Sequence, residues 1–75
     1  MNRERRRQLR QWNAKIEALK SELENILCDE QDCYDNIPEN LQGSSRAMDS
    51  EEAIEQMEEA IEIVDEVIEA IDNIV

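Results

Sequence analysis

The chain has 75 residues, of which 20 are acidic and 8 are basic, so its formal net charge is -12 at pH 7. With one glycine, one proline and no histidine or phenylalanine, this composition argues against a turn-rich β fold and against a histidine-based active site. Hydrophobic residues make up 40% of the chain and recur with a helical period, which argues against disorder. We expect one domain, residues 1–75, whose small core needs support from oligomerisation.

The first predicted helix spans residues 3–35, because nothing in this segment breaks a helix before Pro38. Its apolar residues alternate in steps of three and four, as in the a/d seam of a coiled coil. The stripe comprises Leu9, Trp12, Ile16, Leu19, Leu23 and Ile26, and its register continues through Glu30, Cys33 and Ile37. We therefore expect Trp12 and Cys33 to lie in the seam, whereas Cys28 is expected at the surface.

A connection is predicted over residues 36–45, which hold the only proline and the only glycine of the chain. Pro38 can begin one short helical turn through Leu41, which Gly43 would end. Four apolar residues gather at this tip, namely Tyr34, Ile37, Pro38 and Leu41. They either close the hydrophobic seam or form a partner-binding tip.

The second predicted helix spans residues 46–75, and Ser44, Ser45 or Asp49 could cap its start. Its apolar stripe alternates in steps of three and four through Ile54, Met57, Ile61, Val64, Ile68, Ile71 and Val75. More apolar residues flank this stripe at Ala53, Ala60, Ile63, Val67 and Ile74. Since a single partner helix covers only the a/d stripe, we assign this second set to self-association. The alternative is that its alanines merely raise helix propensity.

These elements predict an all-α fold, an antiparallel, coiled-coil-like αα-hairpin that dimerises into a four-helix bundle. The hairpin would place the basic start of the first helix beside the acidic end of the second. The basic end comprises Arg3, Arg5, Arg6, Arg7 and Arg10, and the acidic end comprises Glu62, Asp65, Glu66, Glu69 and Asp72. We interpret the arginines as a counterweight that favours the antiparallel register. The alternative, a phosphate-binding helix, conflicts with the net charge and with the scarcity of aromatic residues.

The second helix carries a wide acidic face that includes Glu55, Glu59, Glu62 and Glu66. Such a face can keep an apolar bundle soluble, or it can imitate a phosphate backbone and bind a basic protein. No other chemistry is indicated, because Cys28 and Cys33 are poorly spaced for a disulfide on one helix and no calcium-loop or di-iron pattern is present. We expect no catalytic residue, no cofactor and no metal.

The middle of the chain resembles a group of small acidic helical proteins encoded by phages, prophages and mobile elements of gut Firmicutes. Their shared pattern is an acidic run, an aromatic-Asp-Asn-x-Pro-Glu-x-Leu-Gln segment and repeats of the EEAI type. The matching residues here are Asp29, Glu30, Gln31, Tyr34, Asp35, Asn36, Pro38, Glu39, Leu41 and Gln42. The resemblance implies an origin rather than a mechanism, and it favours a partner among host or phage proteins.

The sequence thus predicts a non-enzymatic protein-interaction module that forms a homodimer or higher oligomer and binds a protein partner. The alternative is an acidic nucleic-acid mimic that inhibits a DNA- or RNA-binding enzyme such as a host defence nuclease. A third possibility is nucleic-acid binding by the arginine-rich N-terminus, which the net charge disfavours. No apolar run approaches the roughly 18 residues that span a bilayer, so we expect a cytoplasmic protein without membrane contact.

Overall fold

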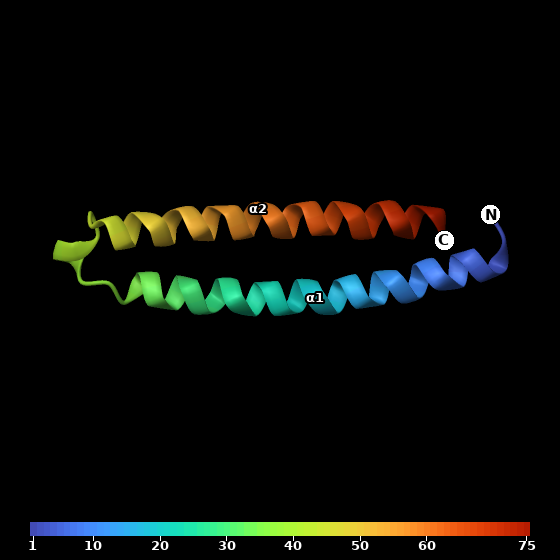
Figure 1. Cartoon of the computed structure of the whole chain (residues 1–75), viewed down its shortest axis with the longest axis horizontal. Coiled ribbons are helices and arrows are strands. Elements are labelled where there is room, and N and C mark those ends of the chain that lie inside the picture. The colour runs from blue at the N-terminus through green and yellow to red at the C-terminus, as the bar shows by residue number, and fades with distance from the viewer.

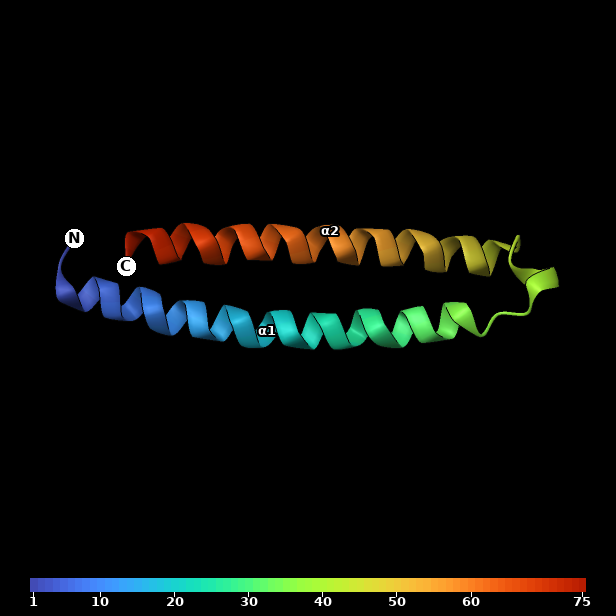
Figure 2. The same cartoon turned by 180° about the vertical axis from the view of Figure 1, so that it is seen from behind.

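A computed structural model describes all 75 residues as two long helices joined by a short turn (Figure 1). Helix α1 spans Arg3–Asp35, the 3₁₀ turn η1 spans Glu39–Leu41, and helix α2 spans Ser45–Ile74. The helices lie antiparallel and side by side in both views (Figures 1 and 2). The Cα atoms extend over 59 × 15 × 13 Å, so the molecule is a rod. The observed helix bounds lie within one residue of the predicted ones.

Polar side chains cap the start of each helix. The Asn2 side chain accepts a hydrogen bond from the Arg5 amide at 2.8 Å and thereby caps α1. The Ser44 hydroxyl accepts a hydrogen bond from the Ala47 amide at 3.3 Å and caps α2. Both residue types are favoured at this position because their short side chains satisfy a free backbone N–H. Of the starts considered for the second helix, the structure uses Ser44.

The connection reverses the chain within a few residues. After Asp35 the helix ends at Asn36, whose backbone N–H donates to the Asp32 carbonyl at 3.1 Å. Pro38 then precedes η1, and the Leu41 amide donates to the Pro38 carbonyl at 2.8 Å. Proline is suited to this position because its φ is already helical and it has no N–H to satisfy. The short turn predicted from Pro38 through Leu41 is therefore present.

The row of α1 that faces α2 differs from the predicted a/d seam. The α1 residues at least partly withdrawn from solvent are Leu9, Asn13, Ile16, Lys20, Leu23, Leu27, Glu30, Gln31 and Tyr34. Trp12 remains 44% exposed, Leu19 and Ile26 are more than half exposed, and Cys33 is exposed. The predicted burial of Trp12 and Cys33 in the seam was therefore wrong.

Asn13 is one physical reason for this shift. It is only 5% exposed, and its Nδ2 donates to the Ile68 carbonyl at 3.1 Å and to Asp72 Oδ1 at 2.9 Å. Its own Oδ1 is buried without a partner. A buried polar side chain that finds its partners in one alignment only specifies that alignment at some cost in stability. Asn13 thus holds α1 against the last turns of α2.

Lys20 and Tyr34 occupy the same heptad row as Asn13 and also bond to acids of α2. Lys20 Nζ lies 2.6 Å from Asp65 Oδ1, and the Tyr34 hydroxyl donates to Glu51. The hydrogen bond to Asp65 raises the pKa of Lys20, and the hydrogen bond to Glu51 raises the pKa of Tyr34. These contacts turn the Asn13 row inwards, because Lys20 can bury its aliphatic stem while its ammonium stays at the surface.

The hydrophobic core is a single thin seam. Only four residues are buried, namely Asn13, Ala47, Ser50 and Ile54, while the rest of the predicted α2 stripe is half-buried. The chain exposes 5892 Å², whereas a compact folded monomer of 8.8 kDa exposes about 4,800 Å². The single chain therefore leaves about 1,100 Å² more surface in water than a compact fold of its mass.

Candidate interaction surfaces

Most of the large exposed apolar residues of the two helices lie on one side of the hairpin. On α1, Trp12, Leu19, Ile26 and Cys33 form a row of sevenfold spacing, here called the flank row. At 100° per residue this row lies roughly 80° around the axis from the centre of the row that contacts α2. On α2, the residues Ala53, Ala60, Val67 and Ile74 lie roughly 90° from the seam in the same rotational sense. Because the two helices are antiparallel, rotations in the same sense away from the seam bring both rows to the same side of the hairpin.

This side is the apolar face, which consists of the flank row together with Ala53, Ala60, Ile63, Val67 and Ile74. Nine large hydrophobic side chains are exposed in the whole chain, and six of them lie here. The six are Trp12, Leu19, Ile26, Ile63, Val67 and Ile74. Scattered apolar residues are normal on a surface, whereas a contiguous patch marks an interaction site. All five residues predicted for self-association belong to this face, and the flank row was missed.

The opposite side of the hairpin is charged and carries most of the polar bonds between the helices. The contacts of Asn13, Lys20 and Tyr34 with α2 all lie on it. The acceptors Glu51, Asp65 and Asp72 share one heptad row of α2. Two matching rows of sevenfold spacing, one on each helix, were the sequence signal that could have revealed the true seam.

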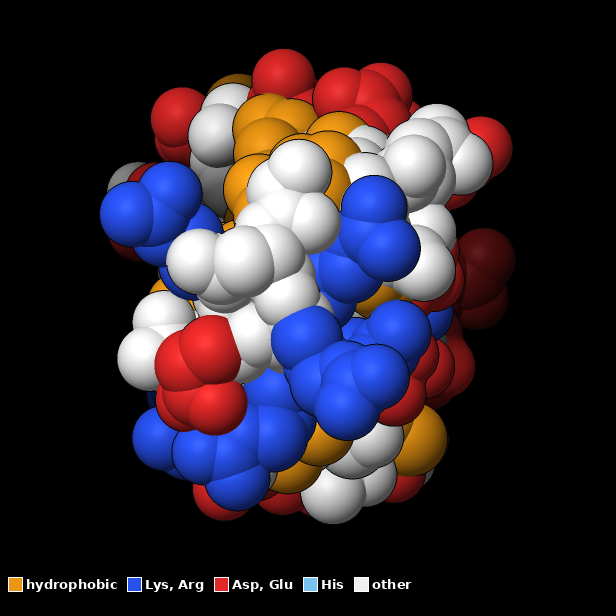
Figure 3. Space-filling view, turned by 90° about the vertical axis from the view of Figure 1, so that its right-hand side faces the viewer, with side chains coloured by type: hydrophobic (Ala, Val, Ile, Leu, Met, Phe, Trp, Pro, Cys, Tyr) orange, Lys and Arg blue, Asp and Glu red, His pale blue; other side chains and the backbone are white.

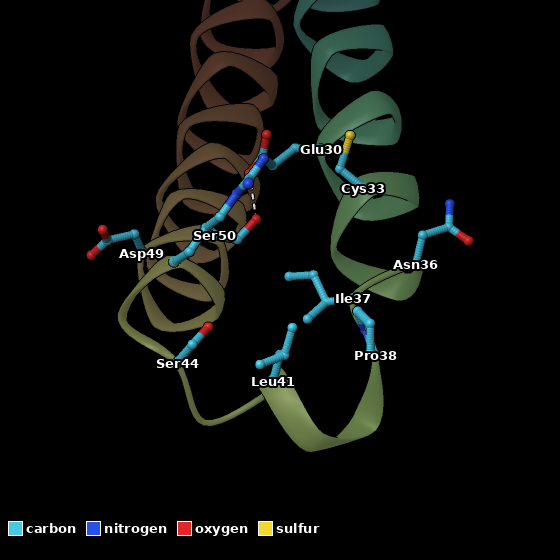
Figure 4. Close-up of a pocket in the computed structure, with 10 residues that line it drawn as sticks. Glu30, Cys33, Asn36, Ile37, Pro38, Leu41, Ser44, Asp49 and Ser50 are labelled. Atoms are coloured by element: carbon cyan, nitrogen blue, oxygen red, sulfur yellow. Dashed lines mark hydrogen bonds between the residues drawn. The ribbon is translucent and has the colours of Figure 1, made fainter.

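The tip carries a pocket of about 650 Å³. It is lined by Glu30, Cys33, Asn36, Ile37, Pro38, Leu41, Ser44, Arg46, Asp49 and Ser50. Figure 4 shows Ile37 and Leu41 pointing into the space between the helix ends, while Asp49 points away from it. Glu30 reaches across from α1 and accepts a hydrogen bond from the Ser50 hydroxyl. Cys33 is the last residue of the flank row, and Arg46 lies one heptad before Ala53 on α2. The pocket therefore adjoins the apolar face.

The structure brings together three of the four tip residues proposed for partner binding. Ile37, Pro38 and Leu41 line the pocket, with Ile37 half-buried and Leu41 exposed. Tyr34 does not line it, because its hydroxyl is bonded to Glu51 on the charged side. The tip therefore closes the seam and leaves a hollow beside it.

A second hollow, of about 420 Å³, lies at the other end of the rod. It is lined by Met1, Arg5, Gln8, Leu9, Trp12 and Ile71. Arg5 lies one heptad before Trp12 and so extends the flank row. The flank row thus begins at this hollow and ends with Cys33 at the tip pocket.

The arginine-rich end does not pair with the acids of α2, contrary to the prediction. Helix α1 extends past the C-terminal end of α2 (Figure 1), because the bond between Asn13 and Asp72 leaves the first turns of α1 beyond their neighbour. The only arginine ion pair joins Arg7 to Glu4 within α1 at 2.9 Å, and the only interhelical ion pair joins Lys20 to Asp65. Figure 3 shows lysine and arginine side chains gathered around the α1 half of this end.

A ridge of carboxylates runs along the side of α2 that points away from α1. It includes Glu55, Glu59, Glu62 and Glu66, all of which are exposed. Arg46 is the only basic residue in α2, so no cation of the same helix neutralises the ridge. This acidic ridge stays accessible whether or not the apolar face is covered.

The side chains show no arrangement of histidine, cysteine and carboxylate groups suited to a metal ion. Cys28 and Cys33 are both free and exposed, which agrees with the prediction for Cys28 and corrects the one for Cys33. Neither helix contains a segment long and apolar enough to cross a membrane.

No protein-family model, no curated protein and no solved structure matches this chain.

Proposed function

We propose that this protein is a non-enzymatic interaction module that self-associates through its apolar face into a four-helix bundle. The observation that supports this most directly is the concentration of six of the nine exposed large hydrophobic side chains on one side of the hairpin. A standard protein interface covers about 800 Å² on each partner. That area is similar to the roughly 1,100 Å² by which the exposed surface exceeds that of a compact monomer. One further copy would cover most of the excess.

Light scattering after size exclusion tests the self-association. The wild-type chain is expected to have twice its single-chain mass of 8.8 kDa. Ile63→Glu places a charge on the apolar face, where the side chain is 53% exposed, and is expected to give single chains. Met48→Glu is the matched control, because Met48 is 60% exposed on another side of α2. A helical wild-type species of 8.8 kDa would contradict the proposal.

The acidic ridge is the surface that we propose for a protein partner. It remains outside the bundle, and a partner that fits it carries a complementary basic surface. The resemblance to proteins of phages and mobile elements points to a host or phage protein in this role. The alternative is that the partner is a DNA- or RNA-binding enzyme and the ridge mimics its substrate. The carboxylates follow one another about every 5 Å along α2, a wider spacing than the roughly 3.4 Å per phosphate of a DNA strand, so this alternative rests on the negative charge of the ridge and not on its spacing.

Competition by DNA separates the two possibilities. The immobilised protein is incubated with host lysate, and retained proteins are eluted with a short DNA duplex at constant ionic strength. A substrate mimic is expected to lose its partner to the duplex, whereas another basic partner is expected to stay bound. Replacing Glu55, Glu59, Glu62 and Glu66 with glutamine is expected to abolish retention in both cases. The matched control neutralises four exposed acids of α1 away from the apolar face, Glu17, Glu24, Asp32 and Asp35, and is expected to retain the partner.

A further inference from the structure

We propose that the second copy binds the apolar face antiparallel to the first, so that Trp12 of each copy enters the tip pocket of the other. This inference rests on the proposed self-association and adds its direction and its contacts. It starts from the flank row, which runs from Trp12 at one end of the rod to Cys33 in the wall of the tip pocket at the other.

The spacing of the flank row is self-complementary in this arrangement. With a two-fold axis midway between Leu19 and Ile26, Leu19 of one copy faces Ile26 of the other. Trp12 then faces Cys33 of the second copy, and no member of the row is left without a counterpart. The tip pocket behind Cys33 measures about 650 Å³, which is within the range of pockets that enclose small molecules. A partly exposed tryptophan opposite such a pocket is a typical interface anchor.

The same axis makes one row of α2 self-complementary. The bonds of Lys20 to Asp65 and of Tyr34 to Glu51 show which levels of the two helices coincide. By that alignment the middle of the flank row is level with residues 62 and 63 of α2, so Ala60 of one copy lies opposite Val67 of the other across the two-fold axis. An alanine opposite a larger side chain allows the two α2 helices to approach closely.

The charge of the first half of the chain reverses along its length, and this favours the antiparallel direction. Residues 1–20 contain seven bases and two acids, whereas residues 21–42 contain seven acids and no base. Two antiparallel α1 helices set each basic half against an acidic half. A dimer with both tips at one end would instead pack α1 on α2 of the second copy, placing residues 21–35 beside acidic residues 49–59. Such complementarity determines the direction of association more than its strength.

The arginine overhang of α1 gains a neighbour in the antiparallel dimer. Residues level with one another across the axis place Arg5, which extends the flank row, near Glu39 of the second copy, and Lys15 near Asp29 of the second copy. The overhang therefore reaches the connection of the other copy. In the single chain neither Arg5 nor Glu39 has an ion-pair partner. Glu22 lies near the axis and meets its own copy, and the two acidic α2 helices also lie side by side, so like-charged contacts remain beside the opposite-charged contacts of the α1 helices.

Cysteine pairs test the direction of the second copy. In a chain that carries Cys28→Ser and Cys33→Ser, Leu19→Cys with Ile26→Cys is expected to form an intermolecular disulfide, with loss of the single-chain band on a non-reducing gel. The two positions of one chain lie two helical turns apart, too far for an internal bridge. The control pair, Leu19→Cys with Val67→Cys, reports the dimer with both tips at one end, in which these two positions are level, and it is expected to stay uncrosslinked. Circular dichroism of the reduced variants verifies that they fold.

Trp12 fluorescence tests the contact with the tip pocket. Trp12 is the only tryptophan, and within one chain it is separated from Leu41 by most of a rod 59 Å long. Leu41→Gln is therefore expected to shift the Trp12 emission to longer wavelength only through the second copy. In the Ile63→Glu background the same substitution is expected to leave the emission unchanged.

The outcomes separate this inference from the proposed self-association. Crosslinking of the control pair, or of neither pair in a chain that has the mass of a dimer, would overturn the antiparallel direction and leave self-association standing. An unshifted Trp12 emission in the dimeric Leu41→Gln variant would overturn the contact with the pocket. A wild-type chain of single mass would overturn both proposals.

Discussion

Asn13 illustrates how a single polar side chain selects one of two possible seams on a helix. Both the Asn13 row and the flank row could face α2 by period alone. Asn13 finds two acceptors on α2, whereas Trp12, Leu19 and Ile26 bring no polar group that α2 could satisfy. Because a buried amide must be hydrogen-bonded while an apolar side chain can be covered elsewhere, the polar row turns inwards and the apolar row outwards.

Asn13→Ala is expected to lower the free energy of unfolding by roughly 1–3 kcal/mol, because two hydrogen bonds are lost and a small void is left. Urea denaturation at a fixed protein concentration measures the change. Asn25→Ala is the control, since Asn25 is exposed on α1 and makes no side-chain hydrogen bond, and it is expected to alter stability by no more than about 0.5 kcal/mol. Equal effects of the two substitutions would show that Asn13 has no special role.

The ion pair of Lys20 with Asp65 is expected to make the stability of the fold depend on pH in the alkaline range. Its bond to Asp65 raises the pKa above the ordinary value of 10.5, so the folded state holds this proton more tightly than the unfolded state. The resulting stabilisation is complete below pH 10.5 and is lost as the pH rises through the raised pKa. The difference in Tm between wild type and Lys20→Gln is expected to be present near pH 8 and to vanish at strongly alkaline pH. A difference that persists there would argue against the ion pair as its cause.

At the scale of the elements, the beginning and end of each helix follow from local chemistry. Capping by Asn2 and Ser44 and termination before Pro38 involve residues that are close in sequence. Such features were accessible from the sequence, which predicted both helices and the short turn between them. The rotation of α1 about its axis was not accessible in this way, because it depends on partners on the other helix, 17 to 59 residues away in the sequence.

Ser44→Ala is expected to destabilise the fold by about 1 kcal/mol, because the Ala47 amide loses its capping acceptor. Thermal unfolding followed by circular dichroism reports the effect. Ser45→Ala provides the control, since Ser45 is exposed in the first turn of α2 and its hydroxyl makes no hydrogen bond. A loss of stability in Ser45→Ala but not in Ser44→Ala would show that Ser44 does not cap α2.

The whole molecule is a rod with a thin seam, and this couples folding to association. With only four buried residues, one chain gains little from the hydrophobic effect relative to the entropy lost in ordering it. The apolar face offers the additional burial, and the charge reversal along α1 offers a direction for it. Stability is therefore expected to depend on the presence of a second chain.

The Tm is accordingly expected to rise with protein concentration. A hundredfold increase favours a folded dimer over unfolded chains by about 2.7 kcal/mol. Circular dichroism melts at two concentrations detect this shift, and the Ile63→Glu variant serves as the control in which it is expected to disappear. An identical Tm for the wild type at both concentrations would mean that one chain is stable alone.

The sequence by itself determined the two helices, the turn at Pro38, the apolar stripe of α2 and the excess of apolar residues beside it. These follow from periodicity, capping and helix-breaking residues, all of which act over a few positions. Only the tertiary structure decided that Asn13, Lys20 and Tyr34 face α2, that the flank row stays exposed and that the arginines extend past the end of α2. Those outcomes depend on which distant acceptors the polar side chains reach, since a helix can turn about its axis without changing any local interaction.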